Sequence, residues 1–446
     1  MTLITTFVTF IALLAWAWGS ALWAHGAGTD SVPWAVYTQS FYLSGVLSIG
    51  LMSLAMVLAV RLTWLERPFG GIDQMYRLHK WTGIAAVGFA AMHWLLEMAD
   101  DIVKALYGRA GRPAEQEYGG WLGALQDVGE EMGEWAIYVA LAMLVITLWK
   151  RFPYHLWRHL HRVMPVLYLG VALHSAVLAP ADYWAHPIGW LLAGLLTVGS
   201  LAAGWTLTGQ VGRSRRYAAT VVSVQTPTPG VTELVCRVQG AWRGHQAGQF
   251  AFLTLNWFEG AHPFTIASAP HGDGLVTFQI KALGDFTRQL GHRAQPGQPV
   301  TVEGPYGQFK LSRQRRSARQ IWVAGGVGVT PFLAWLDSLA EATWQGGAAP
   351  EADLHYFTRQ AADDPFARQL RTRCAAVPSV KLHVHESNIG LTPTPPEQLV
   401  AESAQAGQRT EVWFCGPAGL GQRVRAGLKR KLGWRLRFHQ EAFEMR

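Results

Sequence analysis

The chain has 446 residues, of which 50% are hydrophobic and 21 are tryptophan, and its formal net charge is +8 at pH 7. Its three cysteines, Cys236, Cys374 and Cys415, are too far apart in sequence for a zinc site, a cysteine-ligated iron–sulfur cluster or a disulfide framework. They fit a reduced compartment. The positive charge does not indicate nucleic acid binding, because many Arg and Lys residues flank apolar runs, where such residues orient membrane helices.

Long apolar stretches occupy the first half of the chain, and each is close to the roughly 20 residues that cross the hydrocarbon of a bilayer. The first lacks a basic leader and a clear small-residue cleavage site, so we interpret it as a retained helix rather than a removed signal peptide. The sequence therefore predicts an integral membrane protein with six spans, at residues 3–24, 40–64, 77–97, 134–150, 159–178 and 187–206.

The loops between these stretches differ in charge. The second and fourth loops are basic, with Arg61, Arg67, Arg77 and Lys80 in one and Lys150, Arg151, Arg158 and Arg162 in the other. The third loop is acidic, with Asp100, Asp101, Glu115, Glu117, Asp127, Glu130 and Glu131. Because Lys and Arg mark the cytoplasmic side, the second and fourth loops are predicted inside and the third outside. Both chain ends are then cytoplasmic.

Four histidines lie at matched spacings in two of the stretches, His79 and His93 in the third, and His161 and His174 in the fifth. Each pair is separated by roughly 20 Å along its helix, and both helices run from inside to outside. We therefore expect two haems stacked across the membrane, each held by one imidazole from each helix. His79 would pair with His161 near the cytoplasm, and His93 with His174 nearer the outside.

The spacing in the fifth stretch does not suit an ideal helix, because 13 residues rotate the second imidazole by about 220° from the first. Pro165 removes a helical hydrogen bond four residues after His161, so we expect a kink there. His155 and His159 are alternatives to His161 as the inner ligand. For any single histidine near a helix end, interfacial hydrogen bonding is the ordinary alternative to ligation.

These histidines, with the segment WRHLHRVMPVLYLGVALH, resemble the transmembrane domain of the ferric reductase and NADPH oxidase family. The resemblance covers roughly residues 40–206. It implies that residues 1–210 form an α-helical bundle of six transmembrane helices with two b-type haems.

From residue 211 to 316 the pattern changes to short alternating strands separated by Gly and Pro, which predicts a six-stranded antiparallel β-barrel. The segments HPFTIAS, KALGDFT and EGPYGQF resemble the FAD-binding segments of the ferredoxin reductase superfamily. The resemblance implies FAD, with Phe264 and Thr265 facing the flavin and His262 at the phosphates. The other residues it implies at this cofactor are Pro263, Lys281, Gly284, Phe286 and Thr287.

Strands and helices alternate after Gln320, which predicts an α/β Rossmann-like domain over residues 317–446. In IWVAGGVGVTPFLAWL, Gly325, Gly326 and Gly328 let the backbone approach a pyrophosphate where a helix begins at Thr330 and Pro331. The form GGVGVTP resembles that of the same superfamily. A second strand ends in Thr358 and Arg359, and a basic side chain there favours NADPH over NADH. Arg359 as a solvated loop residue is the alternative.

The segment VWFCGPAGL resembles the superfamily's second nucleotide loop, with Cys415 and Gly416 beside the nicotinamide. The terminal FHQEAFEMR has Glu441 and Phe443 where the family keeps an acidic residue and an aromatic ring that shields the flavin. The resemblance implies that Thr265, Cys415 and Glu441 orient the nicotinamide and manage the proton. A frayed tail is the ordinary alternative.

Together these features predict an NAD(P)H-dependent flavohaem oxidoreductase of the NADPH oxidase or ferric-chelate reductase type, in the inner or plasma membrane of a bacterium. Electrons would pass from cytosolic NADPH through FAD and two b-type haems to oxygen, giving superoxide, or to ferric iron outside. We expect no nucleic acid and no obligatory protein partner. The alternative is a membrane-anchored reductase that serves a ferredoxin or flavodoxin without a haem relay.

Overall fold

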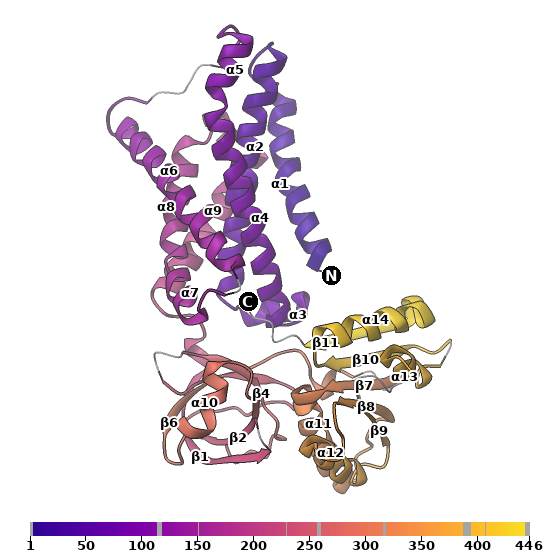
Figure 1. The fold of residues 1–446 in the computed structure, drawn as a ribbon. Helices are drawn as coiled ribbons and strands as arrows, with labels where there is room; N and C mark the ends of the chain where they lie inside the picture. Colours follow the sequence, from indigo (N-terminus) through magenta and orange to yellow (C-terminus); the bar gives the residue numbers. More distant parts are fainter. Residues whose placement is uncertain are drawn as a thin grey trace. The chain divides into compact units, whose positions relative to one another are not determined.

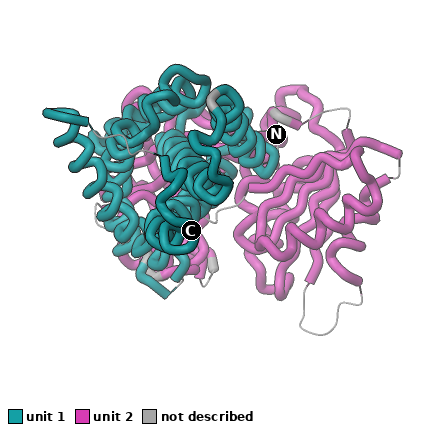
Figure 2. Tube along the Cα trace, turned by 90° about the horizontal axis from the view of Figure 1, so that it is seen from above, with its two compact units in different colours: residues 1–211, 445–446 teal, residues 212–444 magenta. Residues whose placement is uncertain are grey.

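A computed structural model of the chain describes residues 3–113, 118–149, 151–228, 230–256, 260–314, 318–386, 394–405 and 407–441. It divides into two compact units, residues 1–211 and 212–444 (Figure 2). Several predictions fall outside the described residues: Glu115, Glu117, Lys150, Phe443, the domain boundary between residues 316 and 317, and the side chains of Arg67 and His155.

The first unit is helical (Figure 1). Its long helices are α1 (Leu3–His25), α2 (Val32–Ala59), α4 (Ile72–Met98), α6 (Gly120–Leu148), α8 (Met164–Leu178) and α9 (Pro187–Leu207). Shorter helices are α3 (Glu66–Phe69), α5 (Asp100–Tyr107) and α7 (Tyr154–His161). Among the described residues, five segments are long and apolar enough to span a membrane, or six if α4 and α5, bent by 42°, count as one span. A count of six spans therefore stays a prediction.

Two helices begin well before the apolar stretches that predicted them. Helix α2 begins at Val32 rather than at residue 40, because Ser31 is its extended N-cap residue and Pro33 suits a first helical turn. Helix α6 begins at Gly120 rather than at residue 134, and its first turns carry the polar residues Asp127 and Glu130. Hydropathy detects only the apolar part of such helices.

The fifth predicted stretch is broken, because α7 ends at His161 and α8 begins at Met164. The N–H groups of Arg162 and Val163 donate to carbonyls three residues back, at 3.3 and 3.0 Å, which is the tighter 3₁₀ pattern. Pro165 lies in the first turn of α8, where its missing N–H has no helical partner to lose. The expected kink is thus a two-residue 3₁₀ turn, and residues 156–178 still form one candidate membrane span.

The second unit begins with a six-stranded antiparallel sheet in the order β4-β3-β6-β1-β2-β5. Its strands are β1 (Arg216–Thr228), β2 (Val231–Val238), β3 (Phe250–Thr254), β4 (His262–Thr265), β5 (Leu275–Lys281) and β6 (Pro299–Tyr306), and α10 (Asp285–Arg293) follows β5.

The predicted barrel is not closed. Among the described residues, the edge strands β4 and β5 are linked by an isolated bridge between Ile266 and Phe278 rather than by a continuous ladder. Strand β4 has only four residues, and Pro263 within it has no N–H to donate to a neighbouring strand.

The rest of the unit is a five-stranded parallel sheet in the order β11-β10-β7-β8-β9. Its strands are β7 (Arg319–Gly325), β8 (Ala352–Thr358), β9 (Val380–Glu386), β10 (Thr410–Cys415) and β11 (Leu436–Glu441). The helices are α11 (Thr330–Trp344), α12 (Pro365–Ala375), α13 (Pro396–Glu402) and α14 (Ala418–Leu432). The strand order reverses between β7 and β10, and α/β sheets bind nucleotides at such a switch point.

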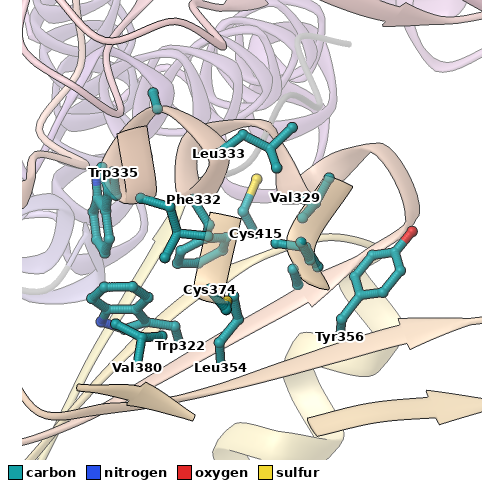
Figure 3. Packing of buried hydrophobic residues seen from close by; sticks show 14 of the residues in the cluster. Trp322, Val329, Phe332, Leu333, Trp335, Leu354, Tyr356, Cys374, Val380 and Cys415 are labelled. Atoms are coloured by element: carbon teal, nitrogen blue, oxygen red, sulfur yellow. The ribbon is translucent and has the colours of Figure 1, made fainter. Parts of the chain in front are cut away.

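Alternate residues of these strands fill two separate cores. Trp322 of β7 packs with Phe332 and Trp335 of α11 in one cluster (Figure 3). Its chain neighbour Val323 packs on the opposite face with Val424 of α14. Because successive side chains of a strand point to opposite faces, a continuous apolar run marks a strand that is buried on both sides.

Candidate functional site

Within the helical unit, the two members of each predicted histidine pair lie next to each other. The ring centroids of His79 and His161 are 6.1 Å apart, and those of His93 and His174 are 6.4 Å apart. Imidazoles bind metals at about 2.0–2.1 Å, which puts two rings that share one metal ion about 6 Å apart between centroids. The change of helix between His161 and Met164 allows both histidines of the fifth stretch to face α4.

Three of these imidazoles are held by backbone carbonyls. Nδ1 of His79 lies 2.9 Å from the carbonyl oxygen of Ala55, and Nδ1 of His93 lies 2.9 Å from that of Phe41. Nδ1 of His174 makes the same 2.9 Å contact with Gly129. A carbonyl oxygen only accepts, so Nδ1 donates and Nε2 keeps its lone pair. This is the usual arrangement of a metal-binding histidine.

His161 differs from the other three, because its buried Nδ1 has no hydrogen-bond partner among the described residues. Its ring stacks on Trp157 at 4.9 Å between centroids. The alternative ligand His159 is exposed, and its Nδ1 lies 3.5 Å from the guanidinium of Arg162. The structure therefore brings His161, rather than His159, next to His79.

Two glycines that the sequence reasoning missed lie against the outer histidine pair. A Cβ added at Gly45 of α2 would be 3.1 Å from Cε1 of His93, and one at Gly133 of α6 would overlap Nδ1 of His174. Nothing in the local sequence distinguishes them from other glycines in helices. Among the described residues, no group of three or more His, Cys, Asp or Glu side chains is arranged to hold a metal ion. Two imidazoles with free Nε2 atoms fit a haem, whose porphyrin supplies the remaining ligands.

In the second unit, the predicted flavin residues gather around a phenylalanine. Thr265 pairs with Phe250 across strands β4 and β3, and Phe250 pairs in turn with Tyr306 of β6. A Cβ at Gly307 would lie 3.0 Å from the Phe250 ring and 3.1 Å from Oε1 of Glu441. Thr265 is thus a neighbour of Phe250, and Glu441 is a neighbour of Gly307, although the two are far apart in sequence. Phe250 was not predicted.

The predicted phosphate-binding residues are near each other at the end of the same sheet. His262 stacks on Phe286 with ring centroids 4.1 Å apart and an interplanar angle of 6°, and it lies 6.4 Å from Phe264. The Thr287 hydroxyl accepts from the N–H groups of Leu283 and Gly284, both at 2.9 Å. Thr287 thereby shapes the loop before α10, and the backbone N–H groups at the helix start remain suited to an anion.

The two glycine-rich loops pack on each other at the switch point between β7 and β10. Gly326 has a φ of +58°, which favours glycine. A Cβ at Gly328 would overlap the carbonyl oxygen of Cys415, and one at Gly416 would lie 2.9 Å from the backbone nitrogen of Gly325. The absence of side chains is what lets the two backbones approach so closely.

Helix α11 begins directly after the first of these loops. The Thr330 hydroxyl donates to the carbonyl of Val327 at 3.1 Å, and Pro331 occupies the first turn of the helix. Lys281 of β5 reaches the same loop, since a Cβ at Gly326 would lie 4.0 Å from its Nζ. The flavin segment and the nucleotide loop are therefore adjacent within this unit.

Cys415 and Glu441 end two neighbouring strands and are direct partners in the β10–β11 register. Both side chains are buried, with 2% and 4% of their surface exposed. Cys415 also faces Ala324, the residue before the first glycine-rich loop. Cys415 and Glu441 therefore lie at the carboxyl end of the parallel sheet, whereas Thr265, the third predicted nicotinamide residue, lies in β4 of the antiparallel sheet.

The end of β8 is shaped by Asp364. Its carboxylate accepts from the hydroxyls of Tyr356, at 2.7 Å, and Thr358, and from the Phe366 N–H at the start of α12. Burial, followed by the neighbouring Asp364, raises the pKa of Tyr356, so its phenol stays a neutral donor. Arg359 follows immediately and is exposed.

Family models match two segments of the chain, one in each compact unit. The model described as "Ferric reductase like transmembrane component" matches residues 44–172, and the model described as "FAD-binding domain" matches residues 217–310.

Individual proteins match over part of this chain and part of their own length. The respiratory burst oxidase homolog protein E of Arabidopsis thaliana is 27% identical over 40% of this chain and 21% of its own length. The dual oxidase 2 of Rattus norvegicus is 26% identical over 63% of this chain and 19% of its own length. The chain thus spans about a fifth of the length of these relatives.

Among solved structures, the flavohemoglobin of Malassezia yamatoensis aligns with a TM-score of 0.47 and 15% identity, over 93% of this chain and 100% of that one. With a ferric reductase-like transmembrane component followed by an FAD-binding domain, the chain is a relative of the ferric reductases and NADPH oxidases.

Proposed function

We propose that this chain carries electrons from NAD(P)H through FAD and two b-type haems to a small acceptor on the other side of a membrane. The observation that carries the proposal is the pairing of His79 with His161 and of His93 with His174, at 6.1 and 6.4 Å between ring centroids. A membrane-anchored reductase without haem would have no need for two such pairs inside an apolar bundle, where ionisable side chains are costly.

The histidines act by holding the haem irons in place. Carbonyls of α2 fix the tautomer of His79 and His93, and the Gly129 carbonyl does so for His174. When bound, flavin converts a two-electron hydride donor into single electrons, which bis-histidine haems relay without binding oxygen at the iron.

The nucleotide and flavin sites use backbone more than side chains. Gly325, Gly326 and Gly328 let a pyrophosphate approach the start of α11, whose N–H groups and dipole favour a negative charge. His262 and the N–H groups of Phe286 and Thr287 would meet the FAD phosphates. Thr265, Cys415 and Glu441 would orient the nicotinamide and hold or release a proton, and Phe443 would cover the flavin face.

The proposed preference of the site for NADPH over NADH rests on Arg359. It follows Thr358, whose hydroxyl is committed to Asp364, so the guanidinium is the polar group at the end of β8 that can reach a 2′-phosphate. NADH remains a second donor, because the rest of the site does not depend on that phosphate.

The direction of transfer follows from the loop charges. We propose six spans in a bacterial inner or plasma membrane, with both chain ends and the second unit in the cytoplasm, because the basic loops mark the inner side. The domains would be residues 1–210 for haem, 211–316 for FAD and 317–446 for NAD(P)H. The acceptor outside would be oxygen or a ferric complex.

The decisive experiment supplies NADPH to the purified full chain and measures superoxide and Fe(II) in parallel, with haem quantified per polypeptide. Two haems per chain and one of the two products are expected. His93 or His174 replaced by Leu should remove one haem and leave NADPH-dependent flavin reduction intact. A chain that contains flavin and no haem spectrum would instead support the anchored reductase.

A further inference from the structure

A strongly basic surface lies on α14 and the turn after it. Seven basic side chains are exposed between residues 418 and 440, and this segment contains no acidic residue. Six of them, Arg423, Arg425, Lys429, Arg430, Lys431 and Arg435, belong to α14 and the turn after it, and we call these six the basic face. Arg437 lies on β11 and points to the opposite face of the sheet, because its neighbours Leu436 and Phe438 pack against α14. The helix covers one face of the parallel sheet (Figure 1).

Helix α14 packs on the sheet through its apolar side, which leaves the basic side chains exposed. Leu420, Val424, Leu428 and Leu432 recur at helical spacing and are buried in the cluster that includes Val323 and Phe414. The helix is therefore anchored to the sheet, and the basic face is a fixed surface of the unit.

Most of this charge is not neutralised within the unit. Lys431 donates to the carbonyl of Ala401, which leaves its charge without a carboxylate partner among the described residues. Arg423, Lys429 and Arg430 have no ion-pair partner among the described residues. The helix dipole accounts for cations in the last turn of α14 but not for Arg423 in its first half.

An aromatic side chain is exposed next to these charges. Trp434, in the turn Gly433–Arg435 that follows α14, is 76% exposed, and the Arg435 guanidinium lies 4.9 Å from the centroid of its ring. Indole rings with one polar edge are enriched where membrane headgroups meet hydrocarbon. A basic surface with an exposed tryptophan is thus suited to a lipid surface rather than to bulk water alone.

We propose that the basic face and Trp434 form a docking surface for the anionic phospholipid headgroups of the bilayer in which the chain is embedded. Basic clusters are attracted to anionic leaflets by roughly fivefold in affinity per Lys or Arg near the surface. The membrane-spanning helices tether the second unit to such a surface, which gives lipid a high effective concentration that a soluble acidic partner lacks. The proposal does not depend on the haem assignment.

Energy transfer between a labelled α14 and the lipid headgroups tests the proposal. Ala426 is exposed and all three native cysteines are buried, so Ala426→Cys gives a selective attachment site for a fluorophore. The labelled full chain is reconstituted in nanodiscs of phosphatidylcholine, with or without phosphatidylglycerol, that carry a headgroup-linked acceptor. We expect stronger transfer in the anionic discs, and its loss at high salt because the Debye length shrinks to a few ångströms.

Matched charge variants identify the surface. The triple variant Arg423→Gln, Lys429→Gln, Arg430→Gln should weaken docking by about a hundredfold, from roughly fivefold per charge. The control Arg368→Gln, Arg371→Gln, Lys381→Gln removes the same charge from exposed positions on α12 and β9 and should dock normally. Flavin content and NADPH-dependent flavin reduction verify that both variants are folded.

Equal transfer in the two kinds of disc, or equal loss in both triple variants, would overturn the proposal. A third result would also overturn it: energy transfer that does not depend on lipid charge, together with binding of soluble polyglutamate or DNA that the first triple variant abolishes. That result would identify a soluble acidic partner. None of these readouts uses electron transfer to an outer acceptor, so failure here and failure of the proposed function are separate outcomes.

Discussion

Nδ1 of His174 donates to the carbonyl oxygen of Gly129, and one helical turn later Gly133 lies directly under the same ring. The two glycines of α6 therefore contribute differently. The first supplies an acceptor, which any residue could supply from its backbone, and the second supplies space, which only glycine can.

This difference gives a matched pair of substitutions. Gly133→Ala should remove the haem that we propose for His93 and His174, because its Cβ would overlap the His174 imidazole. Gly129→Ala should retain it, since its Cβ would lie 3.6 Å from the His174 Cα, an ordinary contact. Haem per polypeptide, measured from the pyridine haemochrome spectrum, should fall from two to one in the first variant alone. Equal haem content in both would exclude a role for this contact.

A second pair of glycines tests the nucleotide loop. Gly328→Ala should raise the Michaelis constant for NADPH by roughly fivefold to a hundredfold, because the added methyl group would overlap backbone, and overpacking costs about 1–3 kcal/mol. Flavin content should be unchanged. Gly419→Ala, at a position with no neighbour within 4 Å, is the control and should behave as the unaltered chain. Equal Michaelis constants for NADPH in the two variants would show that the close contact between the two glycine-rich loops is not required for NADPH binding.

Arg359→Ala should raise the Michaelis constant for NADPH much more than that for NADH. A charge-assisted hydrogen bond to the 2′-phosphate contributes about 1.5–3 kcal/mol, or roughly tenfold to a hundredfold. Arg368→Ala, at an exposed position on α12, should leave the ratio of the two constants unchanged. Parallel increases for both nucleotides after the Arg359 change would show that it does not contact the phosphate.

Acid should weaken the parallel sheet through a buried histidine. Nδ1 of His355 lies 2.9 Å from Nε2 of His385, and its Nε2 lies 2.9 Å from the Ser403 hydroxyl. Burial, with the neighbouring His383 and His385, lowers the pKa of His355 to about 3. The unfolded chain, with a pKa of about 6.5, therefore binds more protons, and stability falls as pH drops from about 6.5 towards the folded value.

The slope reaches at most about 1.4 kcal/mol per pH unit for this one group. Release of bound flavin on heating, followed by its fluorescence between pH 7.5 and 5, measures the trend. His355→Gln should be less stable at neutral pH but should lose less on acidification. Curves of equal slope would assign the acid sensitivity to other groups.

Local patterns were sufficient for most of the architecture and for the pairing of distant residues. The glycine-rich loop after β7 and the loop that begins at Cys415 follow two adjacent strands. This could be expected, because a buried apolar strand precedes each loop and such strands pair in parallel sheets. The 13-residue gap between His161 and His174 correctly indicated a distortion, because a straight helix cannot present both to α4. Its form, a 3₁₀ turn at Arg162 and Val163 within one candidate span, depends on tertiary packing.

Features that depend on non-local contacts were not predictable. The space beside His93 and His174 comes from Gly45 and Gly133, on helices that the sequence does not pair with the histidines. The sheet of β1 to β6 stays open because β4 is short, and the length of an edge strand is set by its neighbours. In the sequence Phe250 is indistinguishable from an ordinary core residue, because its neighbours in β4 and β6 and its proximity to Glu441 appear only in the folded structure.

The change of helix after His161 also has a mechanical consequence. His174 moves with α8, whereas His161 belongs to α7, which has only eight residues and is too short to persist as a helix by itself. Its attachment includes the hydrogen bond from Trp157 Nε1 to the Thr147 hydroxyl, at 2.9 Å. Undocking of that short segment would move His161 away from His79 and leave the contact between His93 and His174 intact. If the four histidines hold two haems as proposed, heating should release the haem at His79 and His161 before the haem at His93 and His174.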